Sequence, residues 1–548
     1  MTPLPWSDHL VVAPVLLPLG TAALMLMLGE GRRSLKAVLN VASAVLGLAI
    51  AVALLLRVDA QGAAAFGVYL PGNWPVPFGI VLVADRLSAL MAVLAGSVGL
   101  AALLYALARW QHAGVYFHVL VQLQLMGLYG AFLTADLFNL FVFFEVLLAA
   151  SYALLLHGGG IERVRAGLHY IAVNLVASLL FLIGVAVLYG VTGTLNMADI
   201  ALKLPQVPDS DRGLLHAGAT ILAVAFLAKA AVWPLNFWLP PAYAAASAPA
   251  AAVFAVLTKV GVYAVLRLWT LCFPPGAGAS AGFGGDVLVW AGVATLGFGA
   301  IGMLASQQLA RLLGFSVIAS SGTLVAAIGF GAPALAGGAL YYLATSTLAA
   351  CALFLLVELL ERSREVELGP RDIDDGNDAL PVFFDAEPPP STNLDDNEEA
   401  LIGRAIPAAL AFLGVSFTAF AMIVAGLPPL AGFVGKLAML SALLDIGGAA
   451  ASTLFALLVA SGLLAALALM RVGMRHFWTT QDRPPPRVRV VETLPIAALL
   501  AASVLLVVHG EAVLRYTRDG ADALHAPARY VDAVMSARPV ARPAEGAR

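Results

Sequence analysis

Residues 228–267 have the sequence AKAAVWPLNFWLPPAYAAASAPAAAVFAVLTKVGVYAVLR, an almost entirely apolar stretch that prolines interrupt in its first half. The second half is long enough to cross a membrane as a helix, since about twenty apolar residues span the hydrocarbon layer. Lys229 and Lys259 lie in these apolar surroundings, where an ionised side chain costs at least about 2.5 kcal/mol unless it is paired or hydrated. The stretch therefore predicts membrane-spanning helices that hold charges, and it indicates charge movement through a membrane.

The rest of the chain has the same apolar character. Of its 548 residues, 61% are hydrophobic and only 11% are charged, so a water-soluble core would not hide the apolar surface. About fourteen continuous apolar runs are long enough to span a bilayer. Such runs are typical of helices, whereas the strands of a membrane barrel alternate between apolar and polar residues. We therefore predict an all-α polytopic membrane protein with about 14 transmembrane helices.

Two of the apolar elements are expected to be discontinuous helices. The interrupting residues are Pro234, Pro240 and Pro241 in the first element, and Gly426, Pro428, Pro429 and Gly432 in the second, which lies within the long run 405–446. Broken helices at membrane depth persist only where the freed backbone groups are buried or hydrated, and they are typical of ion pathways. Lys229 precedes the first break, whereas Lys436 follows the second.

Glu145, in the apolar run 137–156, is a fourth ionisable group at membrane depth. A lysine within about 4 Å would stabilise its carboxylate by roughly 4 kcal/mol. We predict that Glu145 and Lys229 form a pair that switches, that Lys259 relays protons near mid-span, and that Lys436 continues the path. The structural alternatives are an ion pair that only locks two helices together and a lysine that extends to the membrane surface.

The placement of Lys and Arg predicts the topology, because these residues gather at the cytoplasmic ends of spans. It puts both termini outside, counts 405–446 as one discontinuous element, and assigns Arg86 and Arg267 to outside loops.

The segment 361–404 is predicted to be a flexible acidic cytoplasmic loop, either a linker or a docking element. The tail after Glu511 is expected to have little fixed structure. A net charge of −3 provides no basic field for nucleic acid.

The sequence shows no motif for a cofactor, a metal or a catalytic centre. Cys272 and Cys351 form no CxxC pair and are expected to pack against lipid or in the core. The nine histidines lack the clustering typical of haem or metal ligands. The glycine-rich stretches lack the strand and the GxGxxG pattern of nucleotide binding. We therefore expect no cofactor, no metal, no catalytic residue and no enzyme activity.

Three strings of residues carry a resemblance to a known family. They are ADLFNLFVFFEVLLAASYALL at 135–155, the stretch 228–267, and AGLPPLAGFVGKLAMLSALL at 425–444. Together they resemble the proton-conducting antiporter-like family, which includes the large membrane subunits of respiratory complex I and the D-type component of Mrp-type multisubunit cation/proton antiporters. The lysine at position 436 and the acidic insertion at 365–400 are more similar to the Mrp D-type component.

This resemblance implies a fold of about fourteen helices with two inverted five-helix repeats. The implied parts are N-terminal helices at 1–110, a first repeat at 115–269, a second repeat at 286–470 that the loop 361–404 interrupts, a loop and last helix at 471–510, and a C-terminal tail at 511–548. The broken elements would lie at 234–241 and 426–432.

The resemblance also implies roles for single residues. Glu145, Lys229, Lys259 and Lys436 match the family's proton-translocating positions. The chain departs from the family in a helix that includes ALYYLATSTLAACALFLL. There Thr345 stands where many relatives carry histidine and Ala350 where some carry lysine. Water beside Ser346 and Thr347 is expected to complete the relay through that helix.

The implied function is that of an ion-translocating subunit of a bacterial Na⁺/H⁺ or K⁺/H⁺ antiporter in the cell inner membrane, in obligatory assembly with other antiporter subunits. The alternative is a proton-pumping subunit, itself without a redox centre, of complex I or a membrane-bound hydrogenase. A passive scaffold would leave four buried charges unexplained. Neighbouring genes discriminate between the first two: small membrane subunits indicate an antiporter, and iron–sulfur and flavin subunits indicate a redox enzyme.

Overall fold

The computed structural model describes residues 6–29, 31–62, 66–113, 116–365, 408–478 and 488–540, and over these ranges the protein is predominantly helical. A two-stranded antiparallel ribbon, β1 (Gly67–Tyr69) and β2 (Leu82–Ala84), is its described sheet. The α-helices are α1 (Trp6–His9), α2 (Ala13–Met27), α3 (Arg33–Ala60), α4 (Arg86–Ala106), α5 (Phe117–Leu133), α6 (Leu137–Leu156), α7 (Ile161–Thr192), α8 (Met197–Lys203), α9 (Asp209–Lys229), α10 (Leu239–Ala245), α11 (Ala248–Cys272), α12 (Gly285–Ala305), α13 (Leu309–Gly329), α14 (Pro333–Glu365), α15 (Ala408–Ala425), α16 (Ala431–Ile446), α17 (Gly448–Gly473), α18 (Val490–Val508), α19 (Gly510–Leu524) and α20 (Pro527–Met535).

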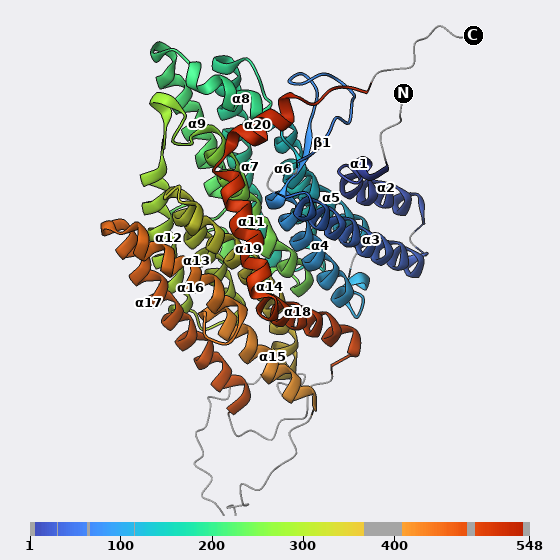
Figure 1. The fold of residues 1–548 in the computed structure, drawn as a ribbon. Helices are drawn as coiled ribbons and strands as arrows, with labels where there is room; N and C mark the ends of the chain where they lie inside the picture. Colours follow the sequence, from blue (N-terminus) through green and yellow to red (C-terminus); the bar gives the residue numbers. More distant parts are fainter. Residues whose placement is uncertain are drawn as a thin grey trace, which may run out of the picture.

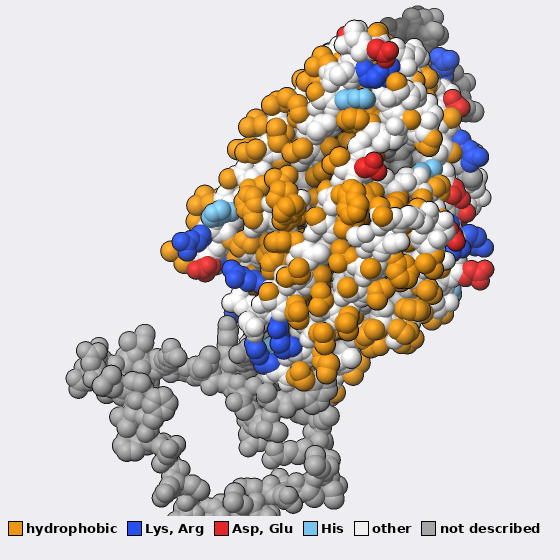
Figure 2. Space-filling view, turned by 90° about the vertical axis from the view of Figure 1, so that its left-hand side faces the viewer, with side chains coloured by type: hydrophobic (Ala, Val, Ile, Leu, Met, Phe, Trp, Pro, Cys, Tyr) orange, Lys and Arg blue, Asp and Glu red, His pale blue; other side chains and the backbone are white. Residues whose placement is uncertain are grey.

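The helices have the length and composition of membrane spans. Among the described residues, 12 helices are long and apolar enough to cross a bilayer, and α2 and α5 are shorter apolar helices. Figure 2 shows a broad band of hydrophobic side chains on the outside of the molecule, with most charged side chains toward its edges. An apolar exterior of this extent matches a lipid solvent. The predicted class, an all-helical membrane protein, is confirmed.

Two long helices form the centre of the fold. α11 and α14 are the most buried of the candidate spans, and Figure 1 shows them between α2 and α3 on one flank and α12 and α17 on the other. α11 packs against α4, α9, α13 and α14. Its contact with α9 depends on Gly261, where an added Cβ would lie 2.7 Å from the carbonyl oxygen of Phe226. The centre therefore brings α9, which ends at Lys229, against the helix that carries Lys259.

The first predicted break is present, with a different role for two of its prolines. α9 ends at Lys229 and α10 begins at Leu239, so Pro234 lies in the non-helical connection. Pro240 and Pro241 lie in the first turn of α10, where a backbone N–H has no partner within the helix. They begin a helix instead of interrupting one.

The second break lies between α15 and α16. α15 ends at Ala425, and Gly426 follows with a φ of 78°, a left-handed conformation that glycine adopts without a steric penalty. Gly432 was expected within the break but lies in the first turn of α16. A Cβ at Gly432 would collide with the carbonyl oxygen of Ile423. Glycine at this position therefore lets the start of α16 pack against the end of α15.

A buried ion pair links α4 to α11. The Arg267 guanidinium donates to both carboxylate oxygens of Asp85, at 2.5 and 2.7 Å. Asp85 is also the N-cap of α4 and accepts from the Ser88 backbone N–H. Burial opposes ionisation of Asp85, but the charge and hydrogen bonds of Arg267, together with the Ser88 bonds, hold its pKa below the ordinary value. The assignment of Arg267 to an outside loop was wrong, since it lies within α11.

Replacing Asp85 by Asn is expected to destabilise the protein by about 3–5 kcal/mol, because it leaves the Arg267 charge buried without a counter-charge. Thermal unfolding of the purified protein in detergent, followed by tryptophan fluorescence, measures the effect. Asp209→Asn is the matched control, since its carboxylate pairs with Arg212 but is 91% exposed, and such pairs contribute at most about 1 kcal/mol. Equal losses in the two variants would contradict a special role for the buried pair.

The C-terminal region is folded, contrary to the expectation from its composition. α19 packs against α14 and α4, and α20 packs against α8. The hydroxyl of Tyr516 donates to the backbone carbonyl of Arg86, and the Arg86 guanidinium lies 3.0 Å from Asp59 and 3.3 Å from Asp519. Tyr530 of α20 lies against Arg267, with 5.3 Å from the guanidinium to the ring centroid. α19 and α20 thus cover the charged ends of α4 and α11.

The acidic segment 361–404 lies mostly outside the described residues. α14 extends to Glu365, so the first residues of the segment continue that helix. The prediction of a flexible loop at 361–404 stays a prediction.

Candidate functional site

Lys229 and Glu145 lie near each other but are not in contact. Lys229 Nζ donates to Ser178 Oγ of α7 at 3.2 Å and lies 5.2 Å from the centroid of the Phe144 ring. Glu145 is partly buried, and its Oε1 has no hydrogen-bond partner among the described residues. The carboxylate still acts electrostatically on the Lys229 ammonium. The direct ion pair predicted from the sequence is therefore absent from the described chain, and the two groups are separated.

A small cavity adjoins the Lys229 side chain. Its volume is about 30 Å³, and its polar lining includes Ser151, Tyr170 and Asn174. The hydroxyls of Ser151 and Tyr170 lie 2.6 Å apart. A cavity of this size with polar walls has room for about one or two water molecules. Water there would extend the hydrogen bonding of the ammonium beyond Ser178.

Lys259 is buried in the centre of the fold, with 2% of its surface exposed. Its Nζ donates to Ser320 Oγ of α13 at 2.9 Å, and Ser320 Oγ lies 3.1 Å from Ser346 Oγ of α14. A cavity of about 20 Å³ adjoins the three groups, and Thr347 also lines it. The alternative that Lys259 extends to the membrane surface is excluded by this burial.

The departures from the family pattern lie in and beside this cavity. Ala350 lines it, whereas the Thr345 hydroxyl bonds to the carbonyls of Tyr341 and Tyr342 in its own helix. Ser346 and Thr347 both line the cavity, which has space for about one water molecule. The cavity therefore has room for water beside these two hydroxyls, and the expectation that such water serves a relay stays a prediction.

Lys436 is also buried and has backbone partners. Its Nζ donates to the carbonyl oxygens of Val424 at 3.2 Å and of Ala425 at 2.9 Å, the last residues of α15. Val424 also lines the cavity beside Lys259. The same residue therefore contacts the Lys436 ammonium and the hydroxyl-lined cavity of Lys259.

Each break has a lysine beside it, in opposite order in the sequence and with different partners. Lys229 is itself the last residue of α9. Lys436 begins one turn inside α16, but its side chain extends back to the last carbonyls of α15. The Lys436 ammonium thus lies at the C-terminal end of α15, where the helix carbonyls and the helix dipole favour a cation, whereas the Lys229 ammonium bonds to Ser178 of α7.

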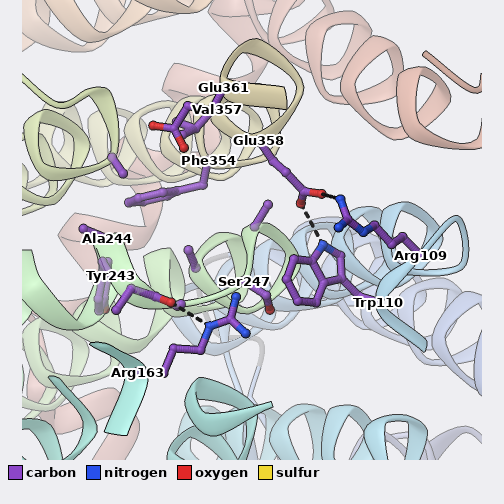
Figure 3. Close-up of a pocket in the computed structure, with 15 residues that line it drawn as sticks. Arg109, Trp110, Arg163, Tyr243, Ala244, Ser247, Phe354, Val357, Glu358 and Glu361 are labelled. Atoms are coloured by element: carbon purple, nitrogen blue, oxygen red, sulfur yellow. Dashed lines mark hydrogen bonds and ion pairs between the residues drawn. The ribbon is translucent and has the colours of Figure 1, made fainter. Parts of the chain in front are cut away.

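A larger cavity of about 280 Å³ opens beside the end of this central group of helices (Figure 3). Glu358 of α14 accepts from Trp110 Nε1 at 2.7 Å and lies 3.9 Å from the Arg109 guanidinium. Arg163 donates to the carbonyl of Ala245 at 2.9 Å. In Figure 3 the Arg109, Trp110 and Glu358 side chains face one another at one side of the opening.

This larger cavity lies close to the cavity of Lys259. Ala251 of α11 and Phe354 of α14 line the larger cavity, whereas Ala255 and Ala350 line the smaller one. On each helix the two lining residues are four positions apart, which is about one turn. The two cavities are therefore separated by about one helical turn.

Several partners of the buried charges could not be identified from the sequence. Ser178, Ser320 and the Asp85–Arg267 pair contribute polar contacts that no motif indicated. The sequence feature that could have indicated Ser320 is the pair of neighbouring serines, Ser320 and Ser321, within the apolar run 312–330. Among the described residues there is no group of three or more His, Cys, Asp or Glu that would hold a metal ion.

Comparisons with known proteins give one consistent result. The family described as "NADH:quinone oxidoreductase/Mrp antiporter, TM" matches residues 134–380. The chain is 50% identical to the D-type component of a probable K⁺/H⁺ antiporter of Rhizobium meliloti, over 97% of this chain and 98% of the relative. It is 33% identical to the D-type component of a Na⁺/H⁺ antiporter of Alkalihalophilus pseudofirmus, over 96% and 99% of the two chains.

Solved structures share the fold. A chain of the Mrp complex from Dietzia sp. DQ12-45-1b is similar with a TM-score of 0.80 at 27% identity, over 97% of this chain and 100% of that one. A chain of respiratory complex I from Thermus thermophilus has a TM-score of 0.72 at 24% identity, over 96% and 100% of the two chains. The second likeness is one of fold alone.

Proposed function

Since this chain belongs to the family of D-type components of multisubunit K⁺/H⁺ and Na⁺/H⁺ antiporters, we propose that Glu145, Lys229, Lys259 and Lys436, all within its apolar helices, form the path along which it moves protons. The protein is a multi-pass membrane subunit of a monovalent cation/proton antiporter and works in a complex with other subunits. It is a transporter subunit of the Mrp type, and its location is the bacterial inner membrane.

The observation that carries the proposal is the connection between Lys259 and Lys436. Lys259 bonds to Ser320, Ser320 lies beside Ser346, and the cavity that adjoins both hydroxyls reaches Val424, whose carbonyl accepts from Lys436. Hydroxyl groups, water and ammonium groups that follow one another in space are the components of a proton relay. The cavity beside Arg109 and Glu358 is the proposed entry, because it lies one turn from the Lys259 cavity.

The order of the helices supports a division into two five-helix repeats, 115–269 and 286–470. Besides the short α8, the first contains α5, α6, α7, the broken pair α9 and α10, and α11. The second contains α12, α13, α14, the broken pair α15 and α16, and α17. The break falls in the fourth member of each set. With α2, α3, α4 and α18, and each broken pair counted once, this arrangement gives about fourteen crossings, with both termini outside by the distribution of Lys and Arg.

The function is tested by expressing the complete antiporter complex in cells that lack their own antiporters. Everted vesicles should lose a preformed pH gradient when Na⁺ or K⁺ is added, and the preferred cation identifies the exchanged ion. The alternative of a proton pump in an oxidoreductase requires an electron donor. Proton movement driven by NADH, without any response to Na⁺ or K⁺, would contradict the antiporter.

Replacing Ser320 by Ala is expected to slow cation-dependent proton transport about ten-fold, because it removes the hydrogen bond that links Lys259 to α14, and bonds to charged groups contribute about 1.5–3 kcal/mol. Ser316→Ala is the matched control. Ser316 lines the same cavity, but its hydroxyl bonds to the Leu313 carbonyl in its own helix. Transport rates in everted vesicles measure both variants, and equal rates would remove Ser320 from the path.

A further inference from the structure

A cavity of about 610 Å³ lies outside the proton path, between α10 and the corner where α12 meets α13. Its walls include Pro240 and Pro241 of the first break and the exposed aromatic residues Phe237 and Phe298. It is about twenty to thirty times larger than the cavities beside Lys229 and Lys259, which have about 30 and 20 Å³. The apolar walls face the outside of the helix bundle, where lipid is the solvent.

The other end of this cavity is basic. Arg311 lines it, is exposed, and makes no hydrogen bond or ion pair within the described ranges. Arg475 donates to Gln307, another lining residue, at 3.2 Å. Arg471 donates to the carbonyls of Leu304 and Ser306 at the same corner, at 2.8 and 2.7 Å. Three guanidinium groups therefore surround the corner, and the described lining contains no carboxylate.

Two further features of this cavity are hydrogen-bond donors that can bind a ligand. Asn236 is 2% exposed, and its Nδ2 has no hydrogen-bond partner in the described chain. Gln308 is the N-cap of α13 but makes no side-chain cap bond, so the first backbone N–H groups of that helix lack a cap there. A buried amide donor and an open helix N-terminus both favour an oxygen-rich anionic ligand.

We propose that this cavity binds an anionic phospholipid, with its phosphate at Arg311 and the N-terminus of α13 and an acyl chain along Phe237 and Phe298. The charge of the rim matches a phosphate, and the apolar walls match a hydrocarbon chain, which a free phosphate ion lacks. The same amphipathic combination, a hydrophobic band with basic side chains at its border, occurs on the face shown in Figure 2. Basic pockets between helices at the cytoplasmic side of a membrane are suited to such headgroups.

The position of the cavity gives the lipid a route to the transport machinery. Pro240 and Pro241 lie in the first turn of α10, which is the second half of the first broken helix. Lys229 is the last residue of its first half, α9. The other side of the break is anchored to α12, because the Trp233 backbone N–H donates to Thr295 Oγ1 at 2.9 Å. A lipid bound between α10 and α12 would hold the break between α9 and α10 in one arrangement. Loss of the lipid would make this break more mobile.

The test uses the complete complex in nanodiscs of phosphatidylcholine with and without phosphatidylglycerol, and native mass spectrometry counts the retained phosphatidylglycerol. Arg311→Gln should weaken the binding of phosphatidylglycerol about five-fold, which is the effect of one basic residue near a membrane surface. Arg311→Lys should retain most of the wild-type binding. Ala305→Phe should reduce binding without a change of charge, since Ala305 is exposed and lines the cavity. Arg165→Gln, an exposed arginine on α7 that does not line the cavity, is the control.

Three outcomes would overturn the proposal. Equal retention of phosphatidylglycerol by the wild type and Arg311→Gln would show that the rim does not bind it. Displacement of the lipid by inorganic phosphate alone, with no effect of Ala305→Phe, would show a simple anion site. Cross-linking of Ala305→Cys to another subunit would show that a protein partner covers the cavity. None of these results depends on transport activity, so they are distinguishable from a failure of the proposed proton path.

Discussion

Replacing Glu145 by Gln is expected to reduce cation-dependent proton transport about 100-fold or more, the lower range for loss of a group that transfers protons, while the complex still assembles. Gln has nearly the same volume, and the buried Oε1 of Glu145 makes no hydrogen bond that the change would break. What disappears is the negative charge that acts on the Lys229 ammonium. The measurement is the rate of pH-gradient dissipation in everted vesicles after addition of Na⁺ or K⁺, with the amount of assembled complex determined in the same membranes.

The control and the partner variant decide what the loss means. Glu162→Gln, at an exposed position in the first turn of α7, should leave transport unchanged. Lys229→Ala should be as severe as Glu145→Gln, and the double variant no worse than either, because two members of one unit do not add. Additive losses would show that Glu145 and Lys229 act separately. Near-normal transport in Glu145→Gln would refute the switch.

The second large effect is expected at Lys436, where Met should abolish transport and Glu should preserve part of it. Lys436→Met keeps the length of the side chain but has no proton to give to the carbonyls of Val424 and Ala425, and a loss of about 100-fold or more follows. A carboxyl in this apolar place holds its proton, because an isolated buried carboxylate is strongly disfavoured. Its O–H can donate to one of the same two carbonyls and still exchange.

The ranking of the two Lys436 variants separates a relay from a structural cap. If the ammonium only balances the carbonyls at the end of α15, Glu should be worse than Met, because an ionised carboxylate brings a negative charge to the negative end of a helix and Met brings none. Near-wild-type transport in both would remove Lys436 from the path. Lys203→Met is the control, since Lys203 pairs with Asp199 on α8, away from both breaks.

The sequence predicts the depth of the buried charges well, because depth is a local property. Lys259 lies near the middle of a 25-residue apolar helix, so its side chain has no short route to either membrane surface. The positions of both breaks follow equally from local chemistry, since proline and glycine restrict or free the backbone wherever they occur. The finer roles of Pro240 and Gly432 depend on where each helix begins, which varies by a residue or two with the packing around it.

Partners of the buried charges were not predictable in the same way. Lys259 and Ser320 are 61 residues apart, and Asp85 and Arg267 are 182 apart. Neither contact leaves a periodic signal in either segment, because it depends on which helices become neighbours. The separation of Glu145 from Lys229 is of the same kind, since a favourable pair of charges does not fix the distance between two rigid helices.

The C-terminal helices show a signal that composition concealed. The residues after Glu511 are rich in Ala, Arg and Pro, which favours an unstructured tail. The spacing within that region indicates otherwise: Tyr516, Gly520 and Leu524 are all buried and are four residues apart, the pattern of one helix face. The composition of the tail and its residue spacing therefore point to opposite outcomes, and the structure follows the spacing, which the prediction of little fixed structure did not use.

The cover that α19 and α20 form over α4 and α11 has a consequence for how the protein is made. The contact between Tyr516 and Arg86 joins residues 430 apart, so Arg86 is translated long before Tyr516 and Asp519 leave the ribosome. Until the last part of the chain is translated, Arg86 lacks its contact with Tyr516, and Arg267 lacks its contact with Tyr530. Synthesis thus ends with a step that covers helices translated much earlier, and a nascent chain that stops before Gly510 carries the four residues of the proposed proton path but lacks this cover.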